Sequence, residues 1–81
     1  MSTPLTIHLN GQQRILDTLE SPSPLSRVIS ALELKADRIA VEHNGEIVTR
    51  TAWPEAQIAT GDRLEIVHFV GGGLKESSLS S

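Results

Sequence analysis

Two Asn-Gly dipeptides, Asn10-Gly11 and Asn44-Gly45, place the strongest constraint on how this 81-residue chain can fold. A two-residue type I′ hairpin turn needs positive φ angles at both positions, and Asn-Gly supplies them at low cost. The first dipeptide follows Leu5-Thr6-Ile7-His8-Leu9, where apolar and polar residues alternate with the period of a half-buried strand. The chain is then expected to pair back over residues 12–17. The candidate apolar anchors of this returning strand are Ile15 and Leu16.

The segment between the two dipeptides predicts a helix. Ser23 is a candidate N-cap, and Pro24 fits the first helical position, where its missing N–H costs nothing. Apolar residues then recur with the spacing of one helical face, which predicts about three turns that end near Leu34-Lys35. These apolar residues are Leu25, Val28, Ile29 and Leu32.

The second half of the chain has the pattern of strands. Residues 38–43 and 46–48 flank the second Asn-Gly turn, a short turn surrounds Trp53, and a final strand covers residues 63–69. Trp53 is expected to be an anchor that plugs one end of the sheet. This order predicts an α+β protein with a β-grasp (ubiquitin-like) fold, in which one helix covers a mixed sheet of about five strands.

The composition excludes several classes of function. The chain has no cysteine, so it forms no disulfide and performs no chemistry on a thiol. Its net charge of −3 and its two aromatic residues argue against nucleic-acid binding, which uses basic faces and stacking platforms. No apolar run is long enough to span a membrane. Met1–Pro4 has neither the basic region nor the apolar core of a secretory signal, so we expect a cytoplasmic protein.

The last predicted strand divides its side chains between two faces. Leu64 and Ile66 share one parity and should face the helix. Val67 and Phe69 take the other parity and should form an exposed apolar patch, which often marks a docking surface. The candidate rim contacts on the same face are Arg63 and Glu65.

The remaining polar side chains give weaker indications. His8, His43 and His68 lie on three separate predicted strands without a short ligand spacing, so we predict no metal site. Asp62, in the turn at residues 60–62, is expected to form the turn rather than act as a base. No grouping of serine, histidine and aspartate predicts a catalytic triad.

Three glycines, Gly71, Gly72 and Gly73, follow the last strand. Without a Cβ, such a segment can thread a narrow channel and leaves its carbonyl open to attack. The same run could equally be a linker to the eight residues that follow. We expect residues 1–73 to form the folded domain and residues 74–81 to be a flexible polar extension.

Taken together, these segments resemble a known family. Residues 39–48, Trp53 and residues 61–73 look like the thiamine-pathway sulfur carrier family ThiS, and the similarity covers about Leu5 to Gly73. The resemblance implies a ubiquitin-like carrier that binds no cofactor and is not an enzyme. Gly73 would be adenylated by an ATP-dependent activating enzyme and would receive sulfur from a sulfur-donating enzyme. The resulting thiocarboxylate would give its sulfur to thiazole synthase, with Gly71 and Gly72 as the flexible arm.

The chain departs from this family after Gly73, because an amide at that position cannot be adenylated. Either a protease removes residues 74–81, or they are foreign to the natural chain, or this copy carries no sulfur. Three rival functions stay open. One is the small subunit of molybdopterin synthase, which usually has a Pro-Pro pair where His68-Phe69-Val70 stands. The others are a ubiquitin-like modifier that forms isopeptide bonds and a binding module that keeps its tail.

Overall fold

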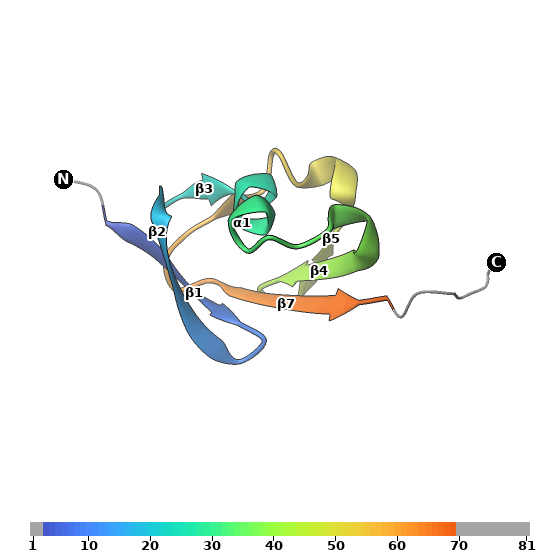
Figure 1. The fold of residues 1–81 in the computed structure, drawn as a ribbon, viewed down its shortest axis with the longest axis horizontal. Helices are drawn as coiled ribbons and strands as arrows, with labels where there is room; N and C mark the ends of the chain where they lie inside the picture. Colours follow the sequence, from blue (N-terminus) through green and yellow to red (C-terminus); the bar gives the residue numbers. More distant parts are fainter. Residues whose placement is uncertain (1–2, 70–81) are drawn as a thin grey trace.

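The structure is a computed structural model, and it describes residues 3–69. Five strands form one mixed sheet in the order β2-β1-β7-β4-β5, and α1 lies over one face of it (Figure 1). Two short strands, β3 and β6, pair with each other outside this sheet. The elements are β1 (Pro4–Leu9), β2 (Gln12–Glu20), β3 (Ser23–Pro24), α1 (Leu25–Ala31), a 3₁₀ turn (Ala36–Arg38), β4 (Ile39–His43), β5 (Glu46–Val48), a second 3₁₀ turn (Arg50–Ala52), β6 (Gln57–Ile58) and β7 (Arg63–His68).

Both Asn-Gly hairpins are present. Asn10 and Gly11 have φ angles of 49° and 82° and connect β1 to β2. Asn44 and Gly45, at 51° and 89°, connect β4 to β5. The positive φ at all four positions is the type I′ requirement that the sequence satisfied.

The last strand lies in the middle of the sheet. β7 runs parallel to β1 on one side and antiparallel to β4 on the other. This arrangement, two hairpins joined through a central final strand and covered by one helix, is the β-grasp fold. The predicted α+β class and the predicted mixed sheet are therefore confirmed.

The core lies between α1 and the facing side of the sheet. Trp53 closes it at one end: its side chain is 4% exposed, and its indole Nε1–H donates a hydrogen bond to the Val48 carbonyl at 3.0 Å. The predicted anchor role of Trp53 is confirmed. The other buried apolar residues are Leu5, Ile7, Leu16, Leu25, Val28, Ile29, Ile39, Val41, Ile58, Leu64 and Ile66.

The anchor of β2 differs from the prediction. Ile15 pairs with Thr6 and is 57% exposed, whereas Leu16 pairs with Leu5 and is 7% exposed. Since adjacent residues of a strand point to opposite faces, only one of the two could face the core. The register of the hairpin selects Leu16. A register shift opposite Pro4 and Leu5 then extends β2 to Glu20, beyond the predicted end.

The start of the helix also differs. Ser23 is not its N-cap, because Ser23 belongs to β3 and its hydroxyl donates to the Glu20 carbonyl at 2.5 Å. The N-cap position is Pro24, without a side-chain cap. The first helical N–H groups are instead bound by a distant loop, since Leu25 N donates to the Ala56 carbonyl at 2.8 Å. Backbone from another part of the chain thus provides the cap.

The helix is shorter than the predicted three turns. It ends at Ala31, and Glu33 follows with a φ angle of 60°. The Leu34 N–H donates to the Ile29 carbonyl and the Glu33 N–H donates to the Ser30 carbonyl, which is the Schellman pattern of a helix end.

No described helix of residues 3–69 has the length and apolar character needed to cross a bilayer.

Candidate functional site

The predicted chemical position, Gly73, and the predicted arm, Gly71 and Gly72, lie outside the described residues. What the structure describes is the strand from which they follow. β7 pairs with β1 at Arg63 and Leu64 and with β4 from Leu64 to His68. The pairing on the β4 side continues past the last residue of β7, because the Phe69 N–H donates to the Arg38 carbonyl at 2.8 Å. The segment that precedes the glycines is therefore part of the sheet up to Phe69.

Side chains of β7 alternate as predicted. Leu64 and Ile66 face the core and are 0% and 7% exposed. Val67 and Phe69 are 59% and 56% exposed. The predicted exposed apolar pair is therefore present, and its docking role stays a prediction.

The register of β7 with β4 and β5 brings further residues to the same face. Ala40 lies opposite Val67, Glu42 lies opposite Glu65, and Ile47 of β5 lies opposite Glu42. Ile47 is 74% exposed, the highest value among the exposed large apolar side chains. We call the set Val67, Phe69, Ala40, Ile47, Glu42 and Glu65 the docking face, after the role that the sequence predicts for Val67 and Phe69.

Ile47 is the residue that sequence reasoning missed. Its position in a three-residue strand of mixed polarity gives no amphipathic signal. Only the cross-strand register shows that it continues the face that carries Val67.

The docking face carries two negative charges close together. Glu42 and Glu65 are both exposed and occupy directly opposed positions, an arrangement that is unfavourable between neighbouring strands. Arg63 is also exposed and lies two residues before Glu65, opposite His8 of β1. The predicted rim residues Arg63 and Glu65 therefore share the face with Val67, with the acidic pair nearer to the apolar residues.

A second cluster joins two turns at the start of β7. Nε2 of His43 lies 2.7 Å from Oδ2 of Asp62, which also accepts the Ala59 N–H at 2.9 Å. Asp62 therefore closes its turn, as predicted. Partial burial opposes ionisation of Asp62, but the hydrogen bond from Ala59, with contributions from His43 and Asn44, outweighs it and holds the pKa of this carboxyl below its ordinary value.

The three histidines do not converge. His8 and His68 are exposed on β1 and β7, and His43 is engaged with Asp62. Within residues 3–69, no group of three or more metal-binding side chains is arranged to hold an ion.

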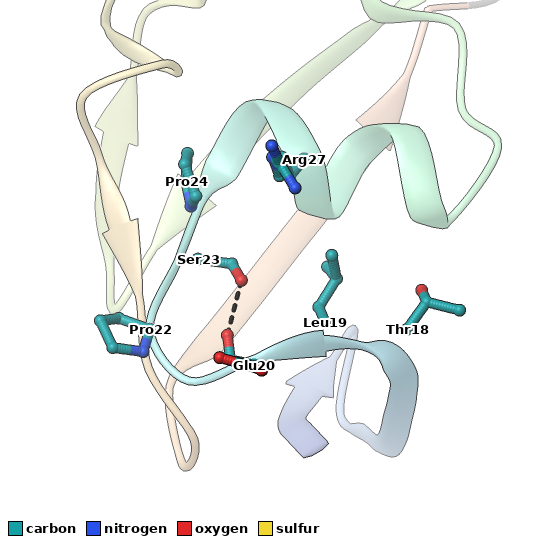
Figure 2. Close-up of a pocket in the computed structure, with 7 residues that line it drawn as sticks. All are labelled: Thr18, Leu19, Glu20, Pro22, Ser23, Pro24 and Arg27. Atoms are coloured by element: carbon teal, nitrogen blue, oxygen red, sulfur yellow. Dashed lines mark hydrogen bonds between the residues drawn. The ribbon is translucent and has the colours of Figure 1, made fainter. Parts of the chain in front are cut away.

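One shallow groove of about 400 Å³ lies between the end of β2 and the start of α1 (Figure 2). Thr18, Glu20, Pro22 and Arg27 are among its lining residues, and Figure 2 shows the hydrogen bond that Ser23, also in the lining, donates to Glu20. Figure 1 places β3, at this groove, towards the opposite end of the molecule from the end of β7. The groove is therefore separate from the docking face and from the segment that precedes the glycines.

Comparison with known proteins gives a consistent result. The sequence profile of the ThiS family matches residues 7–73. The sulfur carrier protein ThiS of Bacillus subtilis is 30% identical over 67 residues, which cover 83% of this chain and 98% of that protein. The crystal structure of the thiamine biosynthesis protein ThiS of Geobacter metallireducens superposes with a TM-score of 0.73 at 30% identity, covering 85% of this chain and 100% of that one.

A longer relative is also similar. A thiazole synthase of Magnetococcus marinus is 32% identical over 69 residues, which are 85% of this chain. This chain spans 20% of the length of that protein.

Proposed function

We propose that this chain, which belongs to the ThiS family, is a sulfur carrier of thiamine biosynthesis and that Gly73 is the residue at which it carries the sulfur. The observation that supports this position is the extent of the family match, which ends at Gly73. A carrier of this kind is a substrate of other enzymes rather than a catalyst. The absence of cysteine from the sequence fits a carrier whose sulfur is held on a backbone carboxyl.

The proposed chemistry requires no side chain of the carrier. The Gly73 carboxylate attacks the α-phosphate of ATP on an activating enzyme and displaces pyrophosphate, which makes the acyl carbon electrophilic. The terminal sulfur of a persulfide on a sulfur-donating enzyme then displaces AMP and forms an acyl disulfide. A second thiol of the partner attacks the S–S bond, which leaves a disulfide on the partner and releases the thiocarboxylate. Thiazole synthase takes its sulfur from this group. ATP is thus consumed at the partner, and the carrier binds no cofactor of its own.

The docking face supplies the recognition in this proposal. Val67, Phe69 and Ile47 offer apolar area, and the opposed pair Glu42 and Glu65 offers negative charge beside it. A partner with an apolar patch flanked by basic side chains would bury the apolar residues of the carrier. Its basic side chains would relieve the repulsion between Glu42 and Glu65. We propose that the activating enzyme and thiazole synthase both present such a surface, and that Arg63 contacts them at the rim.

The partial match to a thiazole synthase supports the proposal that thiazole synthase is a partner of this chain. In that relative, the region similar to this chain is one part of a longer protein named for thiazole synthesis. A carrier and a synthase that act in succession gain effective concentration when they are joined. We propose the cytoplasm as the location, since adenylation consumes ATP.

Removal of residues 74–81 is part of the proposal, because only a free carboxylate at Gly73 can attack ATP. We propose that a protease exposes it. A chain that keeps its tail would instead serve as a binding module through the docking face, and this is the second function that the sequence itself favours.

The experiment is the intact mass of the protein isolated from its native cells. We expect a chain that ends at Gly73. A fraction of the molecules should be about 16 Da heavier than this chain, because sulfur replaces one carboxylate oxygen of the activated acyl group. A companion variant, Gly73→Leu in a chain ending at residue 73, should fold normally and form no thiocarboxylate. A native chain that still ends at Ser81, or a leucine variant that is converted normally, would contradict the proposal.

A further inference from the structure

The side chain of Asn10 pairs with a strand that is distant in sequence. Its Nδ2–H donates to the Ile66 carbonyl at 3.2 Å, and its Oδ1 accepts the Ile66 N–H at 2.7 Å. Its backbone N–H donates to the Leu64 carbonyl at 2.9 Å. The carboxamide of Asn10 thus satisfies both peptide groups of one residue in β7, and both contacts are partly buried.

These contacts extend the sheet beyond the end of a strand. The ladder between β1 and β7 reaches Leu9 opposite Leu64, and the chain then turns away at Asn10 and Gly11. A carboxamide has the donor and acceptor of a peptide group, so Asn10 adds one rung with its side chain. Ile66 also lies opposite Val41 of β4. The N–H and the C=O of Ile66 both point to Asn10, so Val41 and Ile66 form a non-hydrogen-bonded pair, and Asn10 provides the hydrogen bonds that hold Ile66, the residue directly before Val67.

The other Asn-Gly turn holds the opposite end of the same strand. The Asn44 N–H donates to the Arg63 carbonyl, and its Oδ1 accepts the Arg63 N–H, both at 2.8 Å. Asn44 and Asn10 have nearly equal φ angles, 51° and 49°. The two turns are thus chemically matched, but only the contact of Asn10 lies at the end of β7 that leads to the glycines.

We infer that Asn10 is a positioning residue for sulfur carriage, an inference that rests on the proposed function of Gly73. Gly73 follows Ile66 by seven residues, a span of at most about 25 Å. A partner that binds the docking face and the carboxylate together needs a fixed starting point for this span. By holding Ile66 from the β1 side, Asn10 fixes the plane in which β7 presents Val67 and Phe69 and from which the glycines continue.

The test compares Asn10→Gly with Asn44→Gly in chains that end at Gly73. Glycine keeps the positive φ of each turn, so each variant removes only the side-chain contacts. We measure ATP–pyrophosphate exchange by the activating enzyme of the same organism. Asn10→Gly should raise KM about fivefold, the size of effect that one or two neutral hydrogen bonds produce, and leave kcat unchanged. Asn44→Gly should stay within about twofold in both constants.

Hydrogen exchange in the full chain gives a readout that does not depend on activity. The Ile66 amide should exchange about tenfold faster in Asn10→Gly and at an unchanged rate in Asn44→Gly. Asn10→Asp covers the case in which the glycine variant is poorly folded. Its ionised carboxylate accepts the Ile66 N–H but has no donor for the Ile66 carbonyl, so its KM should lie between those of Asn10 and Asn10→Gly.

Four outcomes would overturn this inference. An unchanged KM in Asn10→Gly would show that the contact does not matter for activation, and an equal rise in Asn44→Gly would show that any loosening of β7 suffices. An Ile66 amide that exchanges no faster would remove the structural basis. Absence of exchange activity with the unsubstituted chain ending at Gly73 would overturn the proposed function itself, and this inference with it.

Discussion

Among single residues, Asp62 has the most distinctive environment. Its carboxylate binds the Ala59 N–H within its own turn and lies 2.7 Å from the imidazole of His43, the last residue of β4 before the other turn. The two turns flank the start of β7, so this contact holds together segments that are 19 residues apart in sequence. The ionised form of Asp62 is the one these partners favour.

This environment predicts how stability depends on pH. Because the pKa of Asp62 is lower in the folded state, its contribution is present above the unfolded value of about 4 and is lost as pH falls through the folded value. Asp62→Ala should lower the free energy of unfolding by about 1 to 2 kcal/mol at pH 7. This deficit should narrow below about pH 4. Urea unfolding of both chains at several pH values measures this difference in the free energy of unfolding.

Asp17→Ala is the matched control for this substitution. Asp17 is an exposed aspartate on β2. Its replacement should change stability by less than about 0.5 kcal/mol across the same range. A deficit for Asp62→Ala that is the same at pH 3 and pH 7 would contradict the role assigned to the ionised carboxylate.

What the sequence predicts at this scale depends on whether the cause is local. The Asn-Gly turns follow from φ requirements of the two residues concerned, and Asp62 was correctly expected to form its turn. The contact with His43 could not be predicted, because it needs the register between β4 and β7. The same is true of Asn10, whose partner Ile66 is 56 residues away.

For the elements, the helix shows how a correct pattern can give a wrong boundary. The apolar spacing identified the buried face of α1, with Leu25, Val28 and Ile29 all in the core. Its end was misplaced because the left-handed residue that stops it is Glu33 rather than the usual glycine. Its start was misplaced because Ser23 pairs within β3, a two-residue strand too short to leave a periodic signal.

The exposed strand residues predict a separation between stability and binding. Val67→Ala should weaken the complex with the activating enzyme by about 1 to 2 kcal/mol, because a side chain buried on binding loses its contacts. It should change the free energy of unfolding by less than about 0.5 kcal/mol, since Val67 is 59% exposed. Titration calorimetry with the full chain in the absence of ATP measures the first quantity.

Ile15→Ala provides the comparison for Val67→Ala. Ile15 is 57% exposed but lies on β2, at the far edge of the sheet from the docking face. We expect it to bind the enzyme with unchanged affinity. Equal losses in the two variants would mean that exposed apolar area in general, rather than the docking face, accounts for the binding.

For the whole molecule, the described core predicts that the tail does not contribute to folding. All of the buried apolar residues described lie between Leu5 and Ile66. Ending the chain at Gly73 should therefore leave the thermal midpoint within about 1 °C, whereas a loss of 1 kcal/mol would lower it by about 4 to 8 °C in a domain of this size. Differential scanning calorimetry of the two lengths decides between these outcomes.

The architecture as a whole was predictable because element order and spacing restrict a small α+β chain to few topologies. The parity of β7 also placed Val67 and Phe69 correctly on the exposed face. Ile47 was not predicted, because its place on the docking face depends on which strands are neighbours. The chemistry proposed at Gly73 rests on family resemblance, since it would use no side chain that a pattern could reveal.

The central position of β7 has a mechanical consequence. A partner that draws the glycines into a channel pulls along the axis of this strand, and its ladder bonds to β1 and β4 lie across that axis. Such a load is shared by many bonds in shear, whereas a load on an edge strand can open its bonds one after another. If the proposed partners pull the domain by this end, its fold should stay intact.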